Sequence, residues 1–305
     1  MATQGEVISA RSWLFAPGDS ERKMDKAAAG PADIVIFDLE DAVAEEAKPK
    51  ARSMVSAFLA SRAAAGQGDG AQRDRSTLWV RINPLQGPHA LADLAAVMHA
   101  APAGIMLPKA RGRADLEVLD HYLSALEVVS GIEQGSTKVI ALVTETAEGM
   151  FTTGNYAGAP RLVAMTWGAE DLADAIGASE NRDADGSYGF TYELARSFCL
   201  LGAAAAGVAA VETIHGDFRD DVGLKKRAEQ VRRAGYRGML AIHPNQVPVI
   251  NEAFTPGAEE LAAAREIVEL FAAHPGAGTI GYKGAMLDRP HLARATALLK
   301  LAARR

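Results

Sequence analysis

Short apolar runs of strand length recur along the chain. The residues within each run do not alternate between apolar and polar, and each run is followed by Gly, Pro or charged residues. This pattern is typical of strands that are buried on both faces, as in a parallel sheet. Eight such strands are predicted, at 12–18, 33–41, 78–84, 104–110, 139–146, 161–171, 208–214 and 238–246.

The segments between these runs are predicted to be helices. Residues 114–129, for example, have the sequence ADLEVLDHYLSALEVV, with apolar positions spaced near the helical period. Eight strand–helix units within about 235 residues favour a closed barrel over an open doubly wound sheet. We therefore expect an α/β fold, a (β/α)8 TIM barrel, as a catalytic domain over residues 1–250.

Two regions fall outside the predicted barrel. Residues 61–77 are rich in Gly, Gln and charge, which predicts a solvated surface loop. Residues 251–305 are expected to form a C-terminal helical extension, whose first helix has Leu261, Ala264, Val268 and Phe271 on one face, followed by a Gly-rich turn at 274–284. Because this extension cannot bury its apolar face alone, we expect it to pack on the barrel or on a neighbouring subunit.

Composition narrows the class of protein. The 305 residues are 49% hydrophobic and 23% charged, which is ordinary for a soluble globular protein. The net charge of −6, with both signs interspersed, argues against binding to nucleic acid or to an anionic membrane. A single Cys199 excludes an internal disulfide and fits a reducing compartment. The first residues lack the apolar core of a signal peptide, and no apolar run reaches membrane-spanning length, so a cytoplasmic protein is expected.

Candidate chemistry lies where the predicted strands end, because catalytic groups of such barrels occupy the carboxyl ends of the strands. Most of these groups carry oxygen, which suits Mg²⁺ or Mn²⁺ better than Zn²⁺. Glu145 and Asp171, on adjacent strand ends, could supply a metal-binding pair. The strand ends carry Asp38, Glu40, Asp41, Arg81, Asn83, Pro108, Lys109, Glu145, Glu170, Asp171, His243 and Asn245.

Each candidate also has a purely structural interpretation. Glu145, Asp171 and Asp288 each stand where a helix could begin, so each could cap that helix. Arg81 could simply form an ion pair with an acidic residue of the second strand, and His243, before Pro244, could be a packed histidine. Spacing alone leaves both interpretations open.

Ordered motifs along nearly the whole chain resemble the citrate lyase β-subunit-like family of the HpcH/HpaI aldolase and citrate lyase superfamily, which also includes malyl-CoA and citramalyl-CoA lyases. They are RSWLFAPGDSERKMDKA, DIVIFDLEDAV, VRINP, GIMLPKA, TETAEG, GAEDLADAIG, DFRDDVGL, GMLAIHPNQV and GAMLDRPHLARA. The resemblance implies a TIM barrel and a homotrimer in which the carboxy-terminal segment reaches a neighbour's active site.

The resemblance also implies a role for each matching residue. Glu145 and Asp171 match the direct ligands of Mg²⁺, with Mn²⁺ as a possible substitute. Glu40 and Asp41 match acidic positions that act on the metal through water, and Arg81 matches the arginine that holds the oxo acid.

The remaining matches concern the substrate and the proton. Asp288 matches a carboxylate of the tail that acts as acid or base across the subunit interface. Many relatives have Arg where this chain has Ser20, so the nucleotide end of the site departs from the family pattern. The residues that match substrate-contacting positions are Phe15, Lys26, Glu170, Ile242 and His243.

The implied reaction is reversible cleavage of a malyl-, citramalyl- or citryl-CoA type thioester into acetyl-CoA and a 2-oxo acid. Three alternatives stay open: a thioesterase that uses the same site, a β subunit that acts on an acyl-carrier-protein thioester or only binds within a larger citrate lyase complex, and an aldolase that acts on free acids. The partners expected are therefore small molecules and copies of the chain itself.

Overall fold

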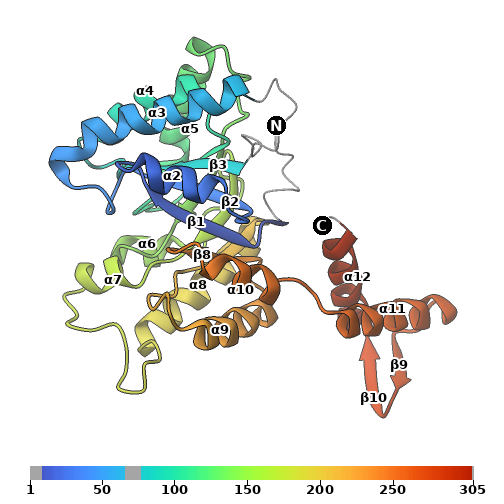
Figure 1. Ribbon diagram of the computed structural model, residues 1–305. Coiled ribbons are helices and arrows are strands. Elements are labelled where there is room, and N and C mark those ends of the chain that lie inside the picture. Colours follow the sequence, from blue (N-terminus) through green and yellow to red (C-terminus); the bar gives the residue numbers. More distant parts are fainter. Residues whose placement is uncertain (1–8, 66–76, 304–305) are drawn as a thin grey trace. The chain divides into compact units, whose positions relative to one another are not determined.

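A computed structural model describes residues 9–65 and 77–303. Eight parallel strands form a closed barrel in sequence order, and the last strand pairs with the first. Helices surround these strands (Figure 1). The (β/α)8 barrel predicted from the apolar runs is confirmed.

The strands of the barrel are short and almost entirely buried. They are β1 (Ser12–Pro17), β2 (Ile34–Asp38), β3 (Leu78–Arg81), β4 (Gly104–Leu107), β5 (Lys138–Leu142), β6 (Leu162–Thr166), β7 (Ala209–Glu212) and β8 (Gly238–Ala241). The helices that go with them are α2 (Glu21–Ala28), α3 (Lys48–Ala65), α4 (Ala90–Val97), α5 (Arg113–Val129), α6 (Ala147–Thr152), α7 (Glu170–Ala175), α8 (Phe190–Ala206), α9 (Asp221–Ala234) and α10 (Gln246–Ala253), with 3-10 turns η1 (Glu45–Ala47) and η3 (Met98–Ala100).

Large side chains fill the barrel near the amino ends of its strands. The rings of Trp13 and Trp79 meet edge to face with centroids 5.5 Å apart. Gly104 makes room for them, because a Cβ at this position would lie 2.3 Å from the Trp79 ring. Since packing fills the inside of the barrel at this end, a cavity can open only at the opposite, carboxyl end of the strands.

A buried ion-pair network fastens the amino end of β5 and β6. The Glu127 carboxylate accepts hydrogen bonds from the backbone N–H groups of Gly135 and Thr137, at 2.7 and 3.0 Å. It also accepts two from the Arg161 guanidinium, at 2.6 and 2.9 Å. We therefore expect this network to serve stability rather than catalysis, which takes place at the other end of such barrels.

The chain divides into two compact units, residues 1–251 and 252–305. The second unit contains α11 (Ala258–Ala273), an antiparallel hairpin of β9 (Thr279–Tyr282) and β10 (Ala285–Asp288), and α12 (Arg289–Ala303). Helices α11 and α12 pack together, and Ala264, Phe271 and Ala295 are buried. The helix expected after residue 257 is therefore present.

Two local predictions are wrong. Part of the predicted Gly-rich turn forms strand β9, which pairs with β10 in a hairpin. Lys283 and Gly284 at its tip have φ values of 46° and 79°, which suit a two-residue turn. The predicted loop at 61–77 begins too early: α3 continues to Ala65, where a run of alanines favours helix. The rest of that loop, 66–76, lies outside the described residues.

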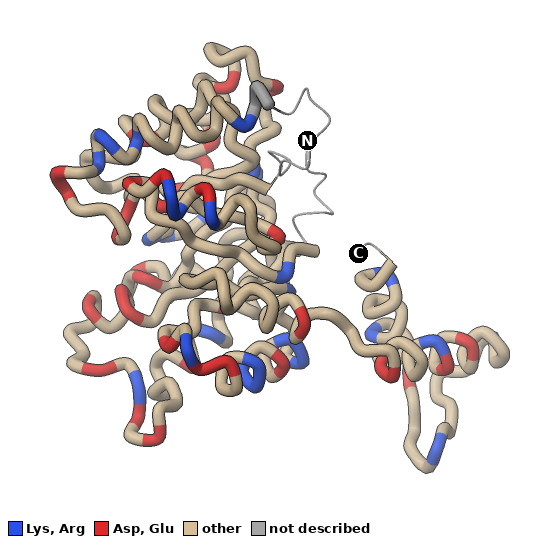
Figure 2. Tube along the Cα trace, viewed as in Figure 1, with Lys and Arg blue, Asp and Glu red and all other residues tan. Residues whose placement is uncertain are grey.

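Acidic and basic side chains are interspersed along the trace, as the sequence predicted (Figure 2). Within 9–65 and 77–303, no helix is long and apolar enough to span a bilayer.

Candidate active site

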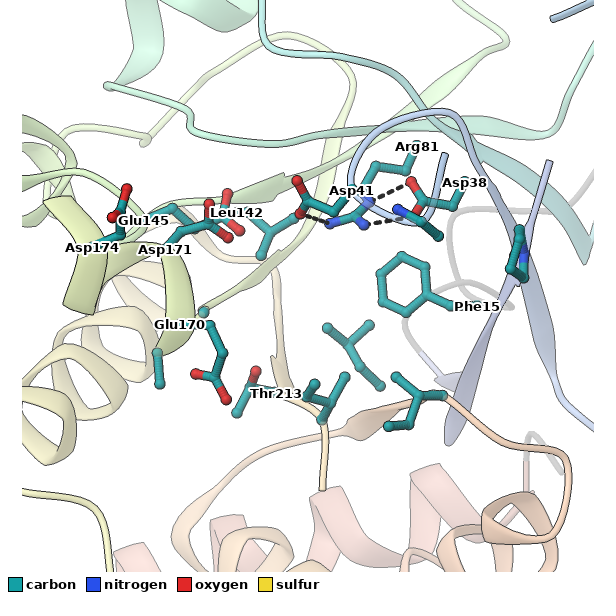
Figure 3. A pocket seen from close by; sticks show the side chains of 17 residues that line it. Phe15, Asp38, Asp41, Arg81, Leu142, Glu145, Glu170, Asp171, Asp174 and Thr213 are labelled. Atoms are coloured by element: carbon teal, nitrogen blue, oxygen red, sulfur yellow. Dashed lines mark hydrogen bonds and ion pairs between the residues drawn. The ribbon is translucent and has the colours of Figure 1, made fainter. Parts of the chain in front are cut away.

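A cavity of about 640 Å³ opens at the carboxyl ends of the barrel strands. Figure 3 shows Glu145, Asp171 and Asp174 together on one part of its wall, with Arg81 beside Asp38 and Asp41. The lining residues are Phe15, Pro17, Asp38, Asp41, Ala42, Arg81, Leu142, Glu145, Gly168, Ala169, Glu170, Asp171, Asp174, Thr213, Ile214, Leu240 and Ile242. Six of the strand-end candidates line this cavity, namely Asp38, Asp41, Arg81, Glu145, Glu170 and Asp171. Glu40, Asn83, Pro108, Lys109, His243 and Asn245 are not among its lining residues.

Arg81, the last residue of β3, is held from several sides. Its Nε and Nη2 donate to the two carboxylate oxygens of Asp38, at 2.7 and 2.6 Å. Its Nη1 lies 2.9 Å from Glu40 and 3.3 Å from Asp41. The ring of Phe15 lies 4.8 Å from the guanidinium carbon, a cation–π distance. The structural interpretation of Arg81 as an ion-pair partner is therefore correct, and it also fixes the guanidinium at the cavity wall.

Asp38 ends β2 and holds the acidic loop that follows. Its carboxylate also accepts the backbone N–H groups of Glu40 and Ala42, at 2.9 and 3.1 Å. Burial alone would raise the pKa of Asp38, but the Arg81 guanidinium and these donors outweigh it and hold the pKa below its usual value. Asp38 is therefore an anion that orients its neighbours.

Lys48 forms hydrogen bonds with the backbone of the same loop. Its ammonium is buried and donates to the carbonyl oxygens of Leu39 and Glu40 at 3.1 and 3.0 Å, and to Asn83 Oδ1 at 2.8 Å. Asn83 in turn donates to the buried Asp93 carboxylate. This network fixes the backbone from which the Glu40 side chain projects.

Glu145 follows β5 and is only 3% exposed. Thr146 caps α6 by accepting the Gly149 N–H at 3.0 Å. Glu145 is therefore not the helix cap, and its carboxylate faces the cavity. The neighbouring position 168 has no side chain, and a Cβ there would lie 3.1 Å from the Glu145 carboxylate.

Lys109 joins three acidic residues. Its backbone N–H donates to Glu145 Oε2 at 2.7 Å, and its ammonium donates to Glu40 Oε1 at 2.7 Å. The ammonium also lies 2.8 Å from Asp171 Oδ1. Burial lowers the pKa of Lys109, but its bonds to Asp171 and Glu40 outweigh burial and raise it.

The crowded carboxylates affect one another. Burial, followed by the charges of Asp171 and Glu40, raises the pKa of Glu145 to about 8. Burial is also the main reason that the pKa of Glu40 rises to about 7. Burial is thus the main cause of both increases, and the charges of neighbouring carboxylates add to it.

Asp171 lies in the first turn of α7, after Ala169, which occupies the cap position without a side-chain bond. It is therefore not the helix cap. Glu170, beside it, accepts a hydrogen bond from Asn181 at 2.6 Å, and burial raises its pKa. Both acidic residues line the cavity.

These residues fit a divalent cation. Within 9–65 and 77–303, no Lys or Arg side chain forms an ion pair with the buried Glu145, although the charge of the Arg81 guanidinium lowers its pKa. No group of three or more His, Cys, Asp and Glu side chains in those ranges is arranged as a complete metal cage. Mg²⁺ does not need one, because it binds through one or two carboxylates and keeps several waters.

The other predicted contact residues differ in their placement. Ile242 lines the cavity, and Gln246 accepts the backbone N–H groups of both Ile242 and His243, at 2.9 and 3.2 Å. The His243 ring stacks on Phe218 with centroids 4.8 Å apart, so it is the packed histidine of the structural interpretation. Lys26 is exposed on α2 and is not among the lining residues.

Asp288 belongs to the second unit, where it ends β10. Its Oδ1 accepts the backbone N–H of His291 at 3.3 Å, three residues into the next helix. This is the hydrogen bond of an N-cap, so that interpretation is correct. The hydrogen bond with the His291 side chain is the largest of the causes that lower the pKa of Asp288.

Three residues that matter for this geometry have no specific role in the sequence-based prediction. The sequence marks Asp38 and Lys109 only as polar groups at strand ends, and Gly168 has no signal beyond its place after β6. Position at a strand end was the only available sign for the two charged residues, because side-chain direction cannot be read from the sequence.

Comparison with known proteins agrees with this geometry. The profile of HpcH/HpaI aldolase/citrate lyase matches residues 11–244. The chain belongs to this family. The resemblance seen in its motifs is therefore confirmed.

Several members of the family are similar to this chain over most of their length. The citrate lyase subunit beta-like protein of Mycobacterium tuberculosis is 37% identical over 290 residues, 95% of this chain and 94% of that protein. The (3S)-malyl-CoA thioesterase of Cereibacter sphaeroides is 32% identical over 93% of this chain and 92% of its own. Citramalyl-CoA lyase of Mus musculus is 30% identical over 97% of this chain and 87% of its own.

Solved structures of the family share the fold. The crystal structure of CitE from Mycobacterium tuberculosis in complex with magnesium, acetoacetate and coenzyme A has a TM-score of 0.79 and 35% identity, and covers 97% of this chain and 98% of its own. Another, of the citrate lyase beta subunit complexed with oxaloacetate and magnesium, has a TM-score of 0.69 and covers 83% of this chain.

Proposed function

We propose that the protein is a Mg²⁺-dependent carbon–carbon lyase that cleaves a 3-hydroxy-3-carboxyacyl-CoA reversibly into acetyl-CoA and a 2-oxo acid. The observation that carries the proposal is that Glu145, Asp171 and the fixed guanidinium of Arg81 line one cavity. Glu40 lies behind them, 2.9 Å from the guanidinium. Family members that bind magnesium, coenzyme A and small oxo acids support it.

Glu145 and Asp171 would hold the cation directly, and Glu40 and Asp41 would hold its water ligands. When bound, the divalent cation supplies Lewis-acid polarisation of substrate oxygens. Asp38 and Lys48 keep the acidic loop in place for this purpose, through the hydrogen bonds described above.

Arg81 has two tasks in the proposed reaction. It binds the oxo-acid part of the substrate, and it stabilises the negative charge that moves onto the thioester oxygen as the carbon–carbon bond breaks. Because Asp38 and Phe15 fix the guanidinium before the substrate arrives, little reorganisation is needed at that step.

The substrate hydroxyl must lose its proton as its carbon becomes a ketone. We propose that Asp288 takes this proton, and that it comes from the tail of a neighbouring copy in a homotrimer. The bonding pair remains with the acetyl carbon, and protonation of the resulting enolate gives acetyl-CoA. In this proposal residues 1–250 form the catalytic barrel and 251–305 form the segment that packs on the neighbour.

A second candidate is a thioesterase of the malyl-CoA type, favoured by the similarity to the Cereibacter sphaeroides thioesterase. The same site would then activate water against the thioester carbonyl. A third is a β subunit that acts on a carrier-protein thioester in a citrate lyase complex, favoured by 30% identity to citrate lyase subunit beta of Haemophilus influenzae.

Product analysis separates these candidates. The protein is incubated with malyl-, citramalyl- and citryl-CoA, with Mg²⁺ or with chelator, and the products are identified by mass spectrometry. Metal-dependent acetyl-CoA plus a 2-oxo acid is the expected result. Free CoA plus the intact hydroxy acid would instead identify a thioesterase. No product from any CoA ester would reject the proposal and favour a carrier-protein substrate.

A further inference from the structure

One residue, Lys109, contacts all three carboxylates of the candidate metal site. Its amide N–H donates to Glu145, and its ammonium contacts Glu40 and Asp171, all within 2.7 to 2.8 Å. These carboxylates come from three separate segments: the loop after β2, the loop after β5 and the start of α7. Lys109 is therefore the point at which the acidic cluster is held together.

The backbone of Lys109 is specialised for these contacts. Its φ is 51°, in the left-handed region that residues with a side chain seldom adopt. Such a conformation persists where surrounding contacts determine it, and it is most frequent at functional sites. Here the next residue, Ala110, donates its N–H to the Leu142 carbonyl at 3.0 Å, which ties this turn to the strand that precedes Glu145.

The ammonium and a divalent cation would use the same acceptor. Asp171 Oδ1 lies 2.8 Å from Lys109 Nζ, yet Asp171 is one of the two residues proposed to hold the cation directly. A cation bound there must share Asp171 with the ammonium or displace it. In either case a fixed positive charge beside the site opposes the binding of another cation.

We infer that Lys109 is a positioning residue that serves as the internal counter-ion of the acidic cluster and competes with the divalent cation for Asp171. Without metal it stabilises the clustered carboxylates, and with metal it weakens the affinity of the site. The inference rests on the proposed function, because it takes a divalent cation as the ligand of this cluster.

A purely structural ion pair would behave differently. Its loss would lower the stability equally with and without metal, and would leave the metal affinity unchanged. Competition instead predicts opposite effects, with lower stability of the metal-free protein and tighter metal binding when the ammonium is removed.

The test compares the wild type with Lys109→Met, which keeps the length of the side chain and removes its charge. Mn²⁺ binding is measured by calorimetry and by electron paramagnetic resonance, and Tm with and without Mn²⁺. We expect the dissociation constant of Lys109→Met for Mn²⁺ to fall on the order of tenfold. Its Tm should fall without metal and approach that of the wild type at saturating Mn²⁺.

Two control variants make the result specific. Lys109→Arg keeps the positive charge and should bind Mn²⁺ more nearly like the wild type. Lys138→Met makes the same chemical change at the amino end of β5, away from the cavity, and should leave the Mn²⁺ affinity unchanged.

The inference is overturned if Lys109→Met binds Mn²⁺ no more tightly than the wild type, or loses the same Tm with and without metal. Failure of the wild type to bind Mn²⁺ would reject both the inference and the proposed function. Normal Mn²⁺ competition without lyase products would reject the proposed reaction and leave the role of Lys109 supported.

Discussion

Asp38 and Arg81 form a bidentate ion pair, in which the guanidinium Nε and Nη2 donate to the two carboxylate oxygens at 2.7 and 2.6 Å. The pair is nearly buried, since the two side chains are 2% and 11% exposed. Removing one partner of such a pair leaves the other charge without compensation, which costs about 3–5 kcal/mol. It also frees a guanidinium that the proposed reaction needs in one place.

We therefore expect Asp38→Asn to lose both stability and activity. A misplaced catalytic group lowers rates by roughly 100-fold, so kcat/KM should fall to this extent, as measured by steady-state kinetics. The control is Asp33→Asn, because Asp33 forms a similar two-pronged pair with Arg11, at 2.9 and 2.8 Å, just before β2 and β1 begin. That variant should lose stability and keep its kcat/KM. Equal activity of the two variants would contradict the role given to Asp38.

Glu145→Gln should abolish activity and leave the stability of the metal-free protein unchanged, the opposite of what we expect for Asp33→Asn. The buried carboxylate stands close to two others, so its replacement by an amide relieves repulsion in the metal-free protein. We expect no loss of Tm without metal, loss of the Tm increase that Mg²⁺ produces in the wild type, and no metal-dependent turnover. Differential scanning fluorimetry with and without Mg²⁺ tests the first two, and product analysis the third. Turnover in the presence of chelator would rule out this role.

Gly168 offers a test of the space beside Glu145. A Cβ at this position would lie 3.1 Å from the Glu145 carboxylate, tighter than ordinary van der Waals contact. Gly168→Ala should therefore weaken Mn²⁺ binding, measured by calorimetry, while the circular dichroism spectrum stays unchanged. Gly154→Ala is the matched control, because nothing lies within 4 Å of a Cβ there. The idea fails if both variants bind Mn²⁺ like the wild type.

The Glu127–Arg161 network at the amino end of the barrel should matter for stability alone. Burial would raise the pKa of Glu127, but its bonds to Arg161, Thr137 and Gly135 outweigh it and lower the pKa. A lowered pKa contributes stability above the unfolded value, about 4.3, that is lost as the pH falls through the folded value.

Glu127→Gln should thus lower the free energy of unfolding by about 3–5 kcal/mol at pH 7. The difference from the wild type should shrink as the pH falls below about 4.3, which urea titrations at several pH values would show. Activity at pH 7 below the unfolding temperature should remain. A difference that stays constant down to pH 3 would contradict this account.

The order of apolar runs was sufficient to predict the barrel, and the barrel was sufficient to predict where Glu145, Asp171 and Arg81 meet. Each of these residues ends or follows a strand whose length and burial the apolar run determines. Local side-chain choices were not predictable in this way: Thr146 and Glu145 both stand where α6 could be capped, and the hydrogen bond to Gly149 decides between them.

Lys109 and the hairpin at 279–288 show a second reason for the missed features. Both depend on a lysine with positive φ, Lys109 and Lys283. A lysine in the sequence does not indicate that conformation. A glycine would have signalled it, whereas a lysine adopts it only because neighbouring contacts outweigh the local preference. Tertiary structure, rather than local sequence, determines these turns.

The cavity wall is chemically two-sided. Charged side chains such as Asp38, Arg81, Glu145 and Asp171 line one side, and Figure 3 shows them as a row that lies apart from Thr213. Apolar side chains such as Ile214, Leu240 and Ile242 come from β7, β8 and the turns that follow them. A substrate of the proposed class would place its carboxylate and hydroxyl against the charged row and its acyl carbons against the apolar one. Within the charged row, Arg81 would take the carboxylate and the side of Glu145 and Asp171 would take the hydroxyl, so three different groups would meet three different surfaces. The mirror image could satisfy only two of these three contacts at once, and the wall would therefore make the proposed reaction stereoselective.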